Sequence, residues 1–276
     1  MYKKIDFRVR PPYGHYLTMF EQEQDHFARL ADAFDLPLSE SQRTGNLDQF
    51  VREMDEAEVE VSVVPGRKAI GVTNNEMLEL ENLHPGRFIV FPYIDPMDCL
   101  PIKEQVDRCM QTGKCHGFSI EPTHQPVPYS FDHQRAFELY EILQEVGLPL
   151  FVSYSAKLMD LIDPDSVKQL AAVAYHFPDL KLVIGHGGWP WHREVMAMAF
   201  NDANIYMIPD MYGLTGAGGE DYIKAANTIM KDQMLFGTAY PIISQKSAAD
   251  YYENSGIKES VLPRFFYDNA AKLLTL

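Results

Sequence analysis

The chain has 276 residues, of which 46% are hydrophobic and 23% are charged, as in an ordinary globular protein. Its formal net charge of −15 at pH 7 argues against a nucleic-acid or anionic-membrane partner. The three cysteines show no C-x-x-C spacing, and no apolar run approaches the roughly 18 residues of a membrane helix. We therefore expect free thiols, no membrane span and a cytoplasmic location.

Short apolar runs alternate with amphipathic segments along the chain, which is typical of a parallel sheet with crossover helices. Eight of the runs are predicted to be strands. In chain order they are KIDFRV, VEVSVVP, RFIVFPYIDP, HGFSIEP, LPLFVSYS, LKLVIGHGG, NIYMIPD and QMLFGTAYP. The first connection, residues 11–44, is too long for a simple crossover, so we expect an excursion that covers a site or forms a homo-oligomer interface.

Helices are predicted between these strands. The segment after residue 46 carries apolar residues at i, i+3, i+4 and i+7, which indicates one helical face. Asp132 is a plausible N-cap, and Gly113 and Gly147 suit helix C-termini. The predicted helices begin near Leu47, Asn74, Ile102, Asp132 and Asp165, and a last one lies in LPRFFYDNAAKLLTL.

Eight strands in alternation with helices predict an α/β fold, a (β/α)8 TIM barrel formed as one domain by residues 1–276. A doubly wound sheet would fit the alternation too, but no glycine-rich loop follows the first strand. In a barrel the site lies at the C-terminal strand ends. The residues expected there are Arg8, Arg10, Pro65, Asp95, Ser119, Glu121, Ser153, Tyr154, His186, Trp189, Asp210, Ala239 and Tyr240.

Two arginines end the first predicted strand. Arg8 and Arg10 stand at i and i+2, so they share one face of that strand. Burying two like charges is costly unless each finds a partner. We predict that they bind a substrate carboxylate through forked hydrogen bonds or stabilise an oxyanion. The alternative is an ion-pair network inside the barrel, with Asp210 or Glu121 as partners.

Two further residues are the predicted catalytic groups. His186 follows an apolar strand and precedes two glycines, so its ring should meet a pocket, where a pKa near neutrality suits acid–base catalysis. It could instead be a hydrogen-bonded structural histidine. Asp210, at the end of the seventh strand, could be a base or a partner for the arginines. The remaining predicted substrate contacts are Ser153, Tyr154, Trp189 and Tyr240.

Three segments, PDLKLVIGHGGWPW, QMLFGTAYP and RFFYDNAAKLL, give the chain a resemblance to the amidohydrolase superfamily, in particular the amidohydrolase-2 branch with its decarboxylases, hydratases and lactonases. The resemblance implies a barrel and a divalent metal, held by a first-strand His-x-His, fifth- and sixth-strand histidines and an eighth-strand aspartate. Carried over to this chain, those positions hold Arg8 and Arg10, Ser153, His186 and Ala239. Because arginine has no lone pair to donate, we expect no catalytic metal and no cofactor.

Three hypotheses follow. The first is a metal-independent enzyme acting on a small carboxylated substrate, most concretely by lactone hydrolysis, with decarboxylation or isomerisation left open. The second is a catalytically degenerate barrel that binds a small anion or a partner protein. The third is a metal bound through His15, His124, His186 and Asp210, whose spacing matches no compact ligand motif.

Overall fold

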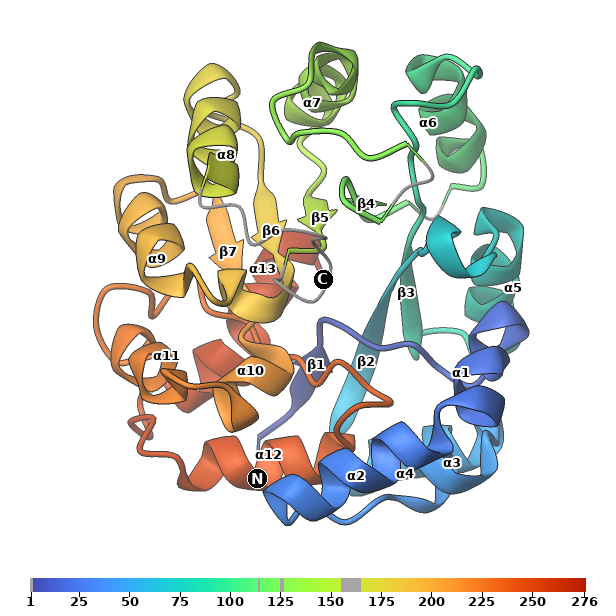
Figure 1. The fold of residues 1–276 in the computed structure, drawn as a ribbon, viewed down its shortest axis with the longest axis vertical. Coiled ribbons are helices and arrows are strands. Elements are labelled where there is room, and N and C mark those ends of the chain that lie inside the picture. Colours follow the sequence, from blue (N-terminus) through green and yellow to red (C-terminus); the bar gives the residue numbers. More distant parts are fainter. Residues whose placement is uncertain (1, 114, 125–126, 155–164) are drawn as a thin grey trace.

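The computed structural model describes residues 2–113, 115–124, 127–154 and 165–276. Seven regular strands form two parallel sheets, ordered β1-β2-β3 and β4-β5-β6-β7, with helices around the outside (Figure 1). The strands are β1 (Lys4–Asp6), β2 (Val59–Pro65), β3 (Phe88–Phe91), β4 (Phe118–Ile120), β5 (Leu150–Val152), β6 (Leu182–Ile184) and β7 (Ile205–Met207). Each pairs in parallel with the next inside its sheet, and the predicted (β/α)8 barrel is confirmed.

Single bridges close the ring. The backbone at Tyr93 pairs with Ser119 and joins the two sheets. The predicted eighth strand is not a regular strand: it forms single bridges only, and near its end Ala239 has a φ of +56° and leaves the extended conformation. Residues 234–240 nevertheless fill the eighth position, since they hydrogen-bond to both neighbours. Their bridges are Met207 with Met234 and Val9 with Tyr240.

The outer layer contains the predicted helices and several more. Asn74 and Asp165 begin helices as predicted, but the helix expected to start at Asp132 is capped by His133, whose ring accepts a hydrogen bond from the Arg135 amide. The helices are α1 (Leu17–Gln22), α2 (Gln24–Phe34), α3 (Glu40–Thr44), α4 (Leu47–Glu56), α5 (Asn74–Leu83), α6 (Ile102–Met110), α7 (Gln134–Val146), α8 (Asp165–His176), α9 (His192–Asn201), α10 (Asp210–Thr215), α11 (Gly219–Ala226), α12 (Gln245–Asn254) and α13 (Asn269–Leu274). Within the described residues, no helix has the length and apolarity needed to cross a membrane. The three cysteines are free, as expected.

Aromatic rings fill the inside of the barrel and form the floor of the site. Phe7 meets Phe91 edge to face at 5.7 Å, and Phe151 lies in the same apolar cluster. Gly117 and Gly185 leave room for these rings, because a Cβ on either residue would lie 2.5–2.6 Å from Phe91 or Phe151. The polar strand ends therefore stand on a packed apolar plug.

Candidate functional site

Charged and polar residues gather above this plug, at the C-terminal ends of the strands. We call the small space between them the arginine cavity. Its lining residues are Arg8, Val9, Arg10, Pro65, Gly66, Arg67, Glu121, Phe151 and Ser153. Its volume of about 10 Å³ corresponds to one water molecule. None of its charged residues is more than 9% exposed, so every charge there needs a compensating partner.

Arg8, Asp210 and His186 form a hydrogen-bonded group beside this cavity. The Arg8 guanidinium donates to Asp210 Oδ2 at 3.1 Å, and the His186 amide donates to the same oxygen at 3.1 Å. The His186 ring nitrogen Nδ1 lies 3.1 Å from Asp210 Oδ1. His186 and Asp210 both have a positive φ, at 57° and 39°, a conformation that non-glycine residues rarely adopt and that concentrates at functional sites.

The protonation of this group follows from its surroundings. Burial, followed by the charge of Arg8, lowers the pKa of the His186 imidazole to about 4, so the ring is neutral at pH 7. Burial acts to raise the pKa of Asp210, but His186 and Arg8 together hold it below its usual value. Nδ1 lies 3.1 Å from Asp210 Oδ1 and 3.4 Å from an Arg8 nitrogen that can only donate, so the shorter contact to the ionised carboxylate favours the tautomer with its proton on Nδ1. The lone pair of His186 then sits on Nε2 and can accept a proton.

A second ion pair occupies the other side of the cavity. Arg67 Nε donates to Glu121 Oε1 at 2.7 Å, and both side chains are buried. Burial opposes the charge of Arg67, but Glu121 more than offsets it and raises the pKa of the guanidinium. Arg67 was not among the predicted site residues; its only sequence signal was its place just after the second predicted strand.

Arg10 has no such partner. Within the described ranges, no hydrogen bond or ion pair holds its guanidinium, although the residue is only 7% exposed. Burial, with repulsion from Arg8 and Arg67, lowers the pKa of Arg10 well below its usual value. The guanidinium remains charged at neutral pH because its ordinary pKa is so high. In the part of the chain that the structure describes, three guanidinium groups thus face two carboxylates, which leaves one positive charge uncompensated there.

Ser153 supplies another unused group. Its backbone amide bonds to Ile120, while its buried Oγ lines the cavity and finds no hydrogen-bond partner in the part of the chain that the structure describes. A buried hydroxyl without a partner is uncommon and costs stability. Arg10 and Ser153 therefore offer donors to a molecule that enters the cavity.

The structure does not bring every predicted contact to this place. The Tyr154 hydroxyl bonds to Ser166 of α8 at 2.6 Å, on the outer side of the sheet. The Tyr240 hydroxyl bonds to Ser41 of α3 at 2.6 Å. Both tyrosines thus point into the layer between strands and helices and away from Arg8.

Trp189 reaches the site only through a neighbour. Its ring stacks on Tyr212 with centroids 4.6 Å apart, and Tyr212 meets the His186 ring edge-on at 5.3 Å. The two aromatic rings form a wall on the His186 side. Tyr212 was not anticipated from the sequence, because it lies in a short helix that no periodicity marks.

Asp6 is another residue that the sequence did not single out. Its carboxylate is fully buried and accepts hydrogen bonds from the Arg8 amide, from the amide and hydroxyl of Thr238, and from the Gln245 side chain. Burial raises the pKa of Asp6 to about 6 despite these donors. Asp6 thereby ties β1 to residues 234–240 and fixes the backbone that carries Arg8.

The donor set does not fit a divalent metal. Where the resemblance implies ligands, Arg8 and Arg10 supply cations, Ala239 supplies no donor, and only His186 carries a strong ligand nitrogen. Among the residues that the structure describes, no group of three or more His, Cys, Asp or Glu could hold a metal ion. The alternative set of His15, His124, His186 and Asp210 forms no such group either.

Comparisons with known proteins agree with this fold. The sequence pattern of the amidohydrolase family matches residues 6–276. Gamma-resorcylate decarboxylase from Polaromonas sp. is 22% identical over 83% of this chain and 87% of its own length. A structure of an uncharacterized TIM-barrel protein from Bordetella bronchiseptica matches with a TM-score of 0.89 and 28% identity, covering 99% of this chain and 98% of that one. The structure of a probable 2-pyrone-4,6-dicarboxylic acid hydrolase from Acinetobacter baumannii, solved with citric acid, matches with a TM-score of 0.64. The match covers 83% of this chain and 88% of that one, and at 13% identity it shows the fold alone.

Proposed function

The chain belongs to the amidohydrolase family, and we propose that it is a metal-independent enzyme that hydrolyses a small carboxylated lactone. One relative named above is a carboxy-lyase, and its name describes a carboxylated compound. An enzyme of this general kind is therefore the expectation from the family, and the finer assignment rests on the site.

The carboxylate is inferred from one observation, the buried and unpaired guanidinium of Arg10. Arg8 is engaged by Asp210 and Arg67 by Glu121, so neither needs a further anion. A substrate carboxylate at Arg10 would neutralise the remaining charge through a charge-assisted hydrogen bond. The hydroxyl of Ser153 lines the same cavity and can donate a second one.

The reaction is inferred from His186. Its Nε2 would accept a proton from water as the water oxygen attacks the lactone carbonyl carbon. Asp210 orients the imidazole and stabilises the imidazolium that forms, and the nearby guanidinium of Arg8 stabilises the oxyanion of the tetrahedral intermediate. The ring C–O bond then breaks, and the imidazolium returns its proton to the alkoxide that leaves. The products are a hydroxyl and a second carboxylic acid on one opened chain, and the acid releases its proton to solvent to become a carboxylate.

Decarboxylation is the second candidate, favoured by the similarity to gamma-resorcylate decarboxylase. In that reaction the same imidazole would be needed as an acid that delivers a proton to carbon. A pKa of about 4 leaves almost every His186 ring unprotonated at neutral pH, so few molecules hold the proton that this reaction needs, and hydrolysis stands first.

The test is a turnover assay with full-length protein purified without chelators or a metal-binding tag. A panel of carboxylated lactones would be followed by acid release, and a panel of hydroxybenzoates by release of CO₂. We expect acid release that is lost in His186→Asn and kept in His176→Asn, a histidine on the outside of the barrel. Release of CO₂ alone would replace hydrolysis by decarboxylation. Thermal stabilisation by these compounds without turnover would support the degenerate barrel and refute the enzyme.

A further inference from the structure

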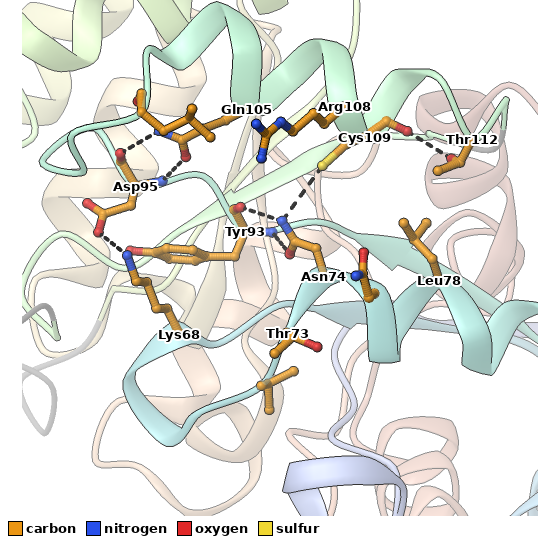
Figure 2. Close-up of a pocket in the computed structure, with 13 residues that line it drawn as sticks. Lys68, Thr73, Asn74, Leu78, Tyr93, Asp95, Gln105, Arg108, Cys109 and Thr112 are labelled. Carbon is orange, nitrogen blue, oxygen red and sulfur yellow. Dashed lines mark hydrogen bonds and ion pairs between the residues drawn. The ribbon is translucent and has the colours of Figure 1, made fainter.

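Most cations near the strand ends of this barrel are held in place by carboxylates. Lys68 is an example outside the arginine cavity: Asp95 and Asp98 each accept a hydrogen bond from its ammonium group at 2.8 Å, and Figure 2 shows the first of these contacts. Arg10 is different, because no described residue holds its guanidinium. Its position therefore depends on the backbone that carries it and on the packing of its stem.

The backbone of Arg10 is attached to Tyr240. The Arg10 amide donates to the Tyr240 carbonyl at 2.9 Å, and the preceding residue, Val9, forms a single bridge with the same tyrosine. Two prolines, at positions 11 and 12, follow at once, and neither has an amide that could continue the pairing. The placement of Arg10 thus depends on where the main chain of Tyr240 lies.

The main chain of Tyr240 needs anchors of its own. Ala239, just before it, has a φ of +56°, a conformation that persists in a non-glycine residue only where its surroundings fix it. One anchor lies on the inner side, where the Tyr240 amide donates to the Thr238 hydroxyl at 3.0 Å and that hydroxyl donates to the buried carboxylate of Asp6. The other anchors lie on the outer side and come from α3 and α4.

The Tyr240 side chain ends in a chain of hydrogen bonds. Its hydroxyl lies 2.6 Å from Ser41 Oγ, and Ser41 donates to the carboxylate of Glu53 with both its hydroxyl and its amide. Because a carboxylate accepts hydrogen bonds, the Ser41 proton is used there, and the Tyr240 hydroxyl is the donor to Ser41. Burial raises the pKa of the Tyr240 phenol, so it keeps the proton that this bond requires.

A second contact from α3 reaches the next residue of the chain. The side-chain amide of Gln42 donates to the Pro241 carbonyl at 2.8 Å, and its oxygen completes the capping box that begins α3. Ser41 and Gln42 are both buried. The sequence singled out the excursion of residues 11–44 by its length, and these contacts of α3 connect it to the site.

We infer that α3 is a clamp that positions Arg10, and that Ser41 and Tyr240 are positioning residues of the anion site. The clamp fixes the backbone of Tyr240 from outside, the Tyr240 carbonyl fixes the Arg10 amide, and the guanidinium is thereby presented to a substrate carboxylate. The inference rests on the proposed function for the substrate alone, because the clamp is a property of the ligand-free protein.

The first measurement is amide hydrogen exchange in full-length Tyr240→Phe, which loses one hydroxyl and keeps the ring. Exchange of the Arg10 amide should become about tenfold faster, as expected for the loss of one buried hydrogen bond. The Val9 amide, which donates to the Val63 carbonyl, should keep its rate. Ser41→Ala breaks the same link from its other end and should have the same effect.

A matched control is Tyr140→Phe. Tyr140 is as buried as Tyr240, and its hydroxyl donates to the Phe131 carbonyl at 2.8 Å, away from the arginine cavity. This variant loses the same group, so it should leave the exchange rate of the Arg10 amide unchanged. A general loss of stability would instead accelerate the Arg10 and Val9 amides together in either variant.

The second measurement is a double-mutant cycle in the lactone assay. Tyr240→Phe should raise KM about tenfold and leave kcat nearly unchanged, because Arg10 binds a part of the substrate that does not react. In the Arg10→Met background the same change should have no further effect on KM, since the group that is positioned is gone.

The two measurements separate the clamp from the proposed function. Equal acceleration at Val9 and Arg10, an unchanged rate at Arg10, or the same increase of KM in both backgrounds would overturn the clamp. A wild-type protein that turns over no lactone would refute the proposed function, and the exchange rates would still decide the clamp.

Discussion

Whether Arg10 binds a ligand or stabilises the fold can be decided by replacing it and measuring the free energy of unfolding. The two roles predict changes of opposite sign. The variant Arg10→Met keeps the aliphatic stem and removes a buried cation that no described residue pairs with. Arg8→Met is the matched comparison, because it removes a cation that Asp210 pairs with at 3.1 Å. The two arginines stand two residues apart and line the same cavity.

The expected magnitudes have opposite signs. Removing the uncompensated charge of Arg10 should raise the free energy of unfolding by about 1–2 kcal/mol, because an unpaired buried charge opposes folding. Removing Arg8 leaves the fully buried Asp210 without its cation, which should lower the free energy of unfolding by about 3–5 kcal/mol. At roughly 2 °C per kcal/mol for a chain of this size, the two melting temperatures should differ by roughly 10 °C.

Although Arg10→Met should stabilise the fold, it should weaken ligand binding. Loss of a charge-assisted hydrogen bond at Arg10 should weaken carboxylate binding in the arginine cavity about 10- to 100-fold. The ¹³C-methyl signals of Val9, which lines this cavity, would report the binding. Arg10→Lys should keep the cost in stability and recover part of the binding, since it retains the charge without the planar fork. Urea unfolding measures the free energy of unfolding. A titration with carboxylated lactones, followed by the Val9 methyl signals, measures the affinity. If Arg10→Met destabilises the fold as much as Arg8→Met, Arg10 is structural and the inferred carboxylate loses its support.

Three more outcomes are expected. His186→Asn should lower kcat by about 10²–10⁴ with little change in KM, and the acid limb of kcat/KM should lie near pH 4, where the pKa of the buried imidazole lies, and not near 6.5. Between about pH 3.8 and 6 the folded state binds the Asp6 proton more tightly than the unfolded state does, so Asp6 makes stability fall as pH rises. The folded state binds the His186 proton less tightly than the unfolded state does, so His186 makes stability fall as pH drops from 6.5 to 4. The two effects nearly cancel in the wild type, so Asp6→Asn should unmask a loss of about 3 kcal/mol between pH 6.5 and 4, measured by urea unfolding at each pH. Elemental analysis should find substoichiometric metal, and EDTA should leave turnover unchanged; a full equivalent of metal lost together with turnover would refute the metal-independent site.

The sequence predicted most of the barrel because its strands are apolar runs and most of its helices are periodic. The bounds of α5 and α8 agree with the prediction at their first residue. Residues 233–241 were predicted as a strand, but the positive φ of Ala239 depends on tertiary contacts that composition does not reveal. The short helices α10 and α11 carry too few residues for a periodic signal.

The sequence predicted many of the residues near the candidate site, but it predicted less well which way their side chains point. Ser153 and Tyr154 are adjacent at the end of one strand, and side chains alternate along a strand, so one points into the barrel and the other outward. The prediction overlooked this alternation when it placed both residues in the site. The ion-pair alternative is the one observed for Arg8, whose partner is Asp210. That Arg10 lacks such a partner among the described residues follows from three-dimensional placement and could not be read from the spacing of the two arginines.

The charges of the described site residues do not balance, and a bound anion would balance them. A metal ion at the same strand ends would bring two positive charges and need acidic or neutral ligands around it. Among the described residues, three guanidinium groups stand against Glu121 and Asp210, and one positive charge remains in a space of about one water. Folding alone does not favour such a charge, since an apolar side chain at position 10 would cost less. A fold that keeps a charge unpaired among its described residues gives up stability, and this trade-off supports the proposal that Arg10 binds an anion.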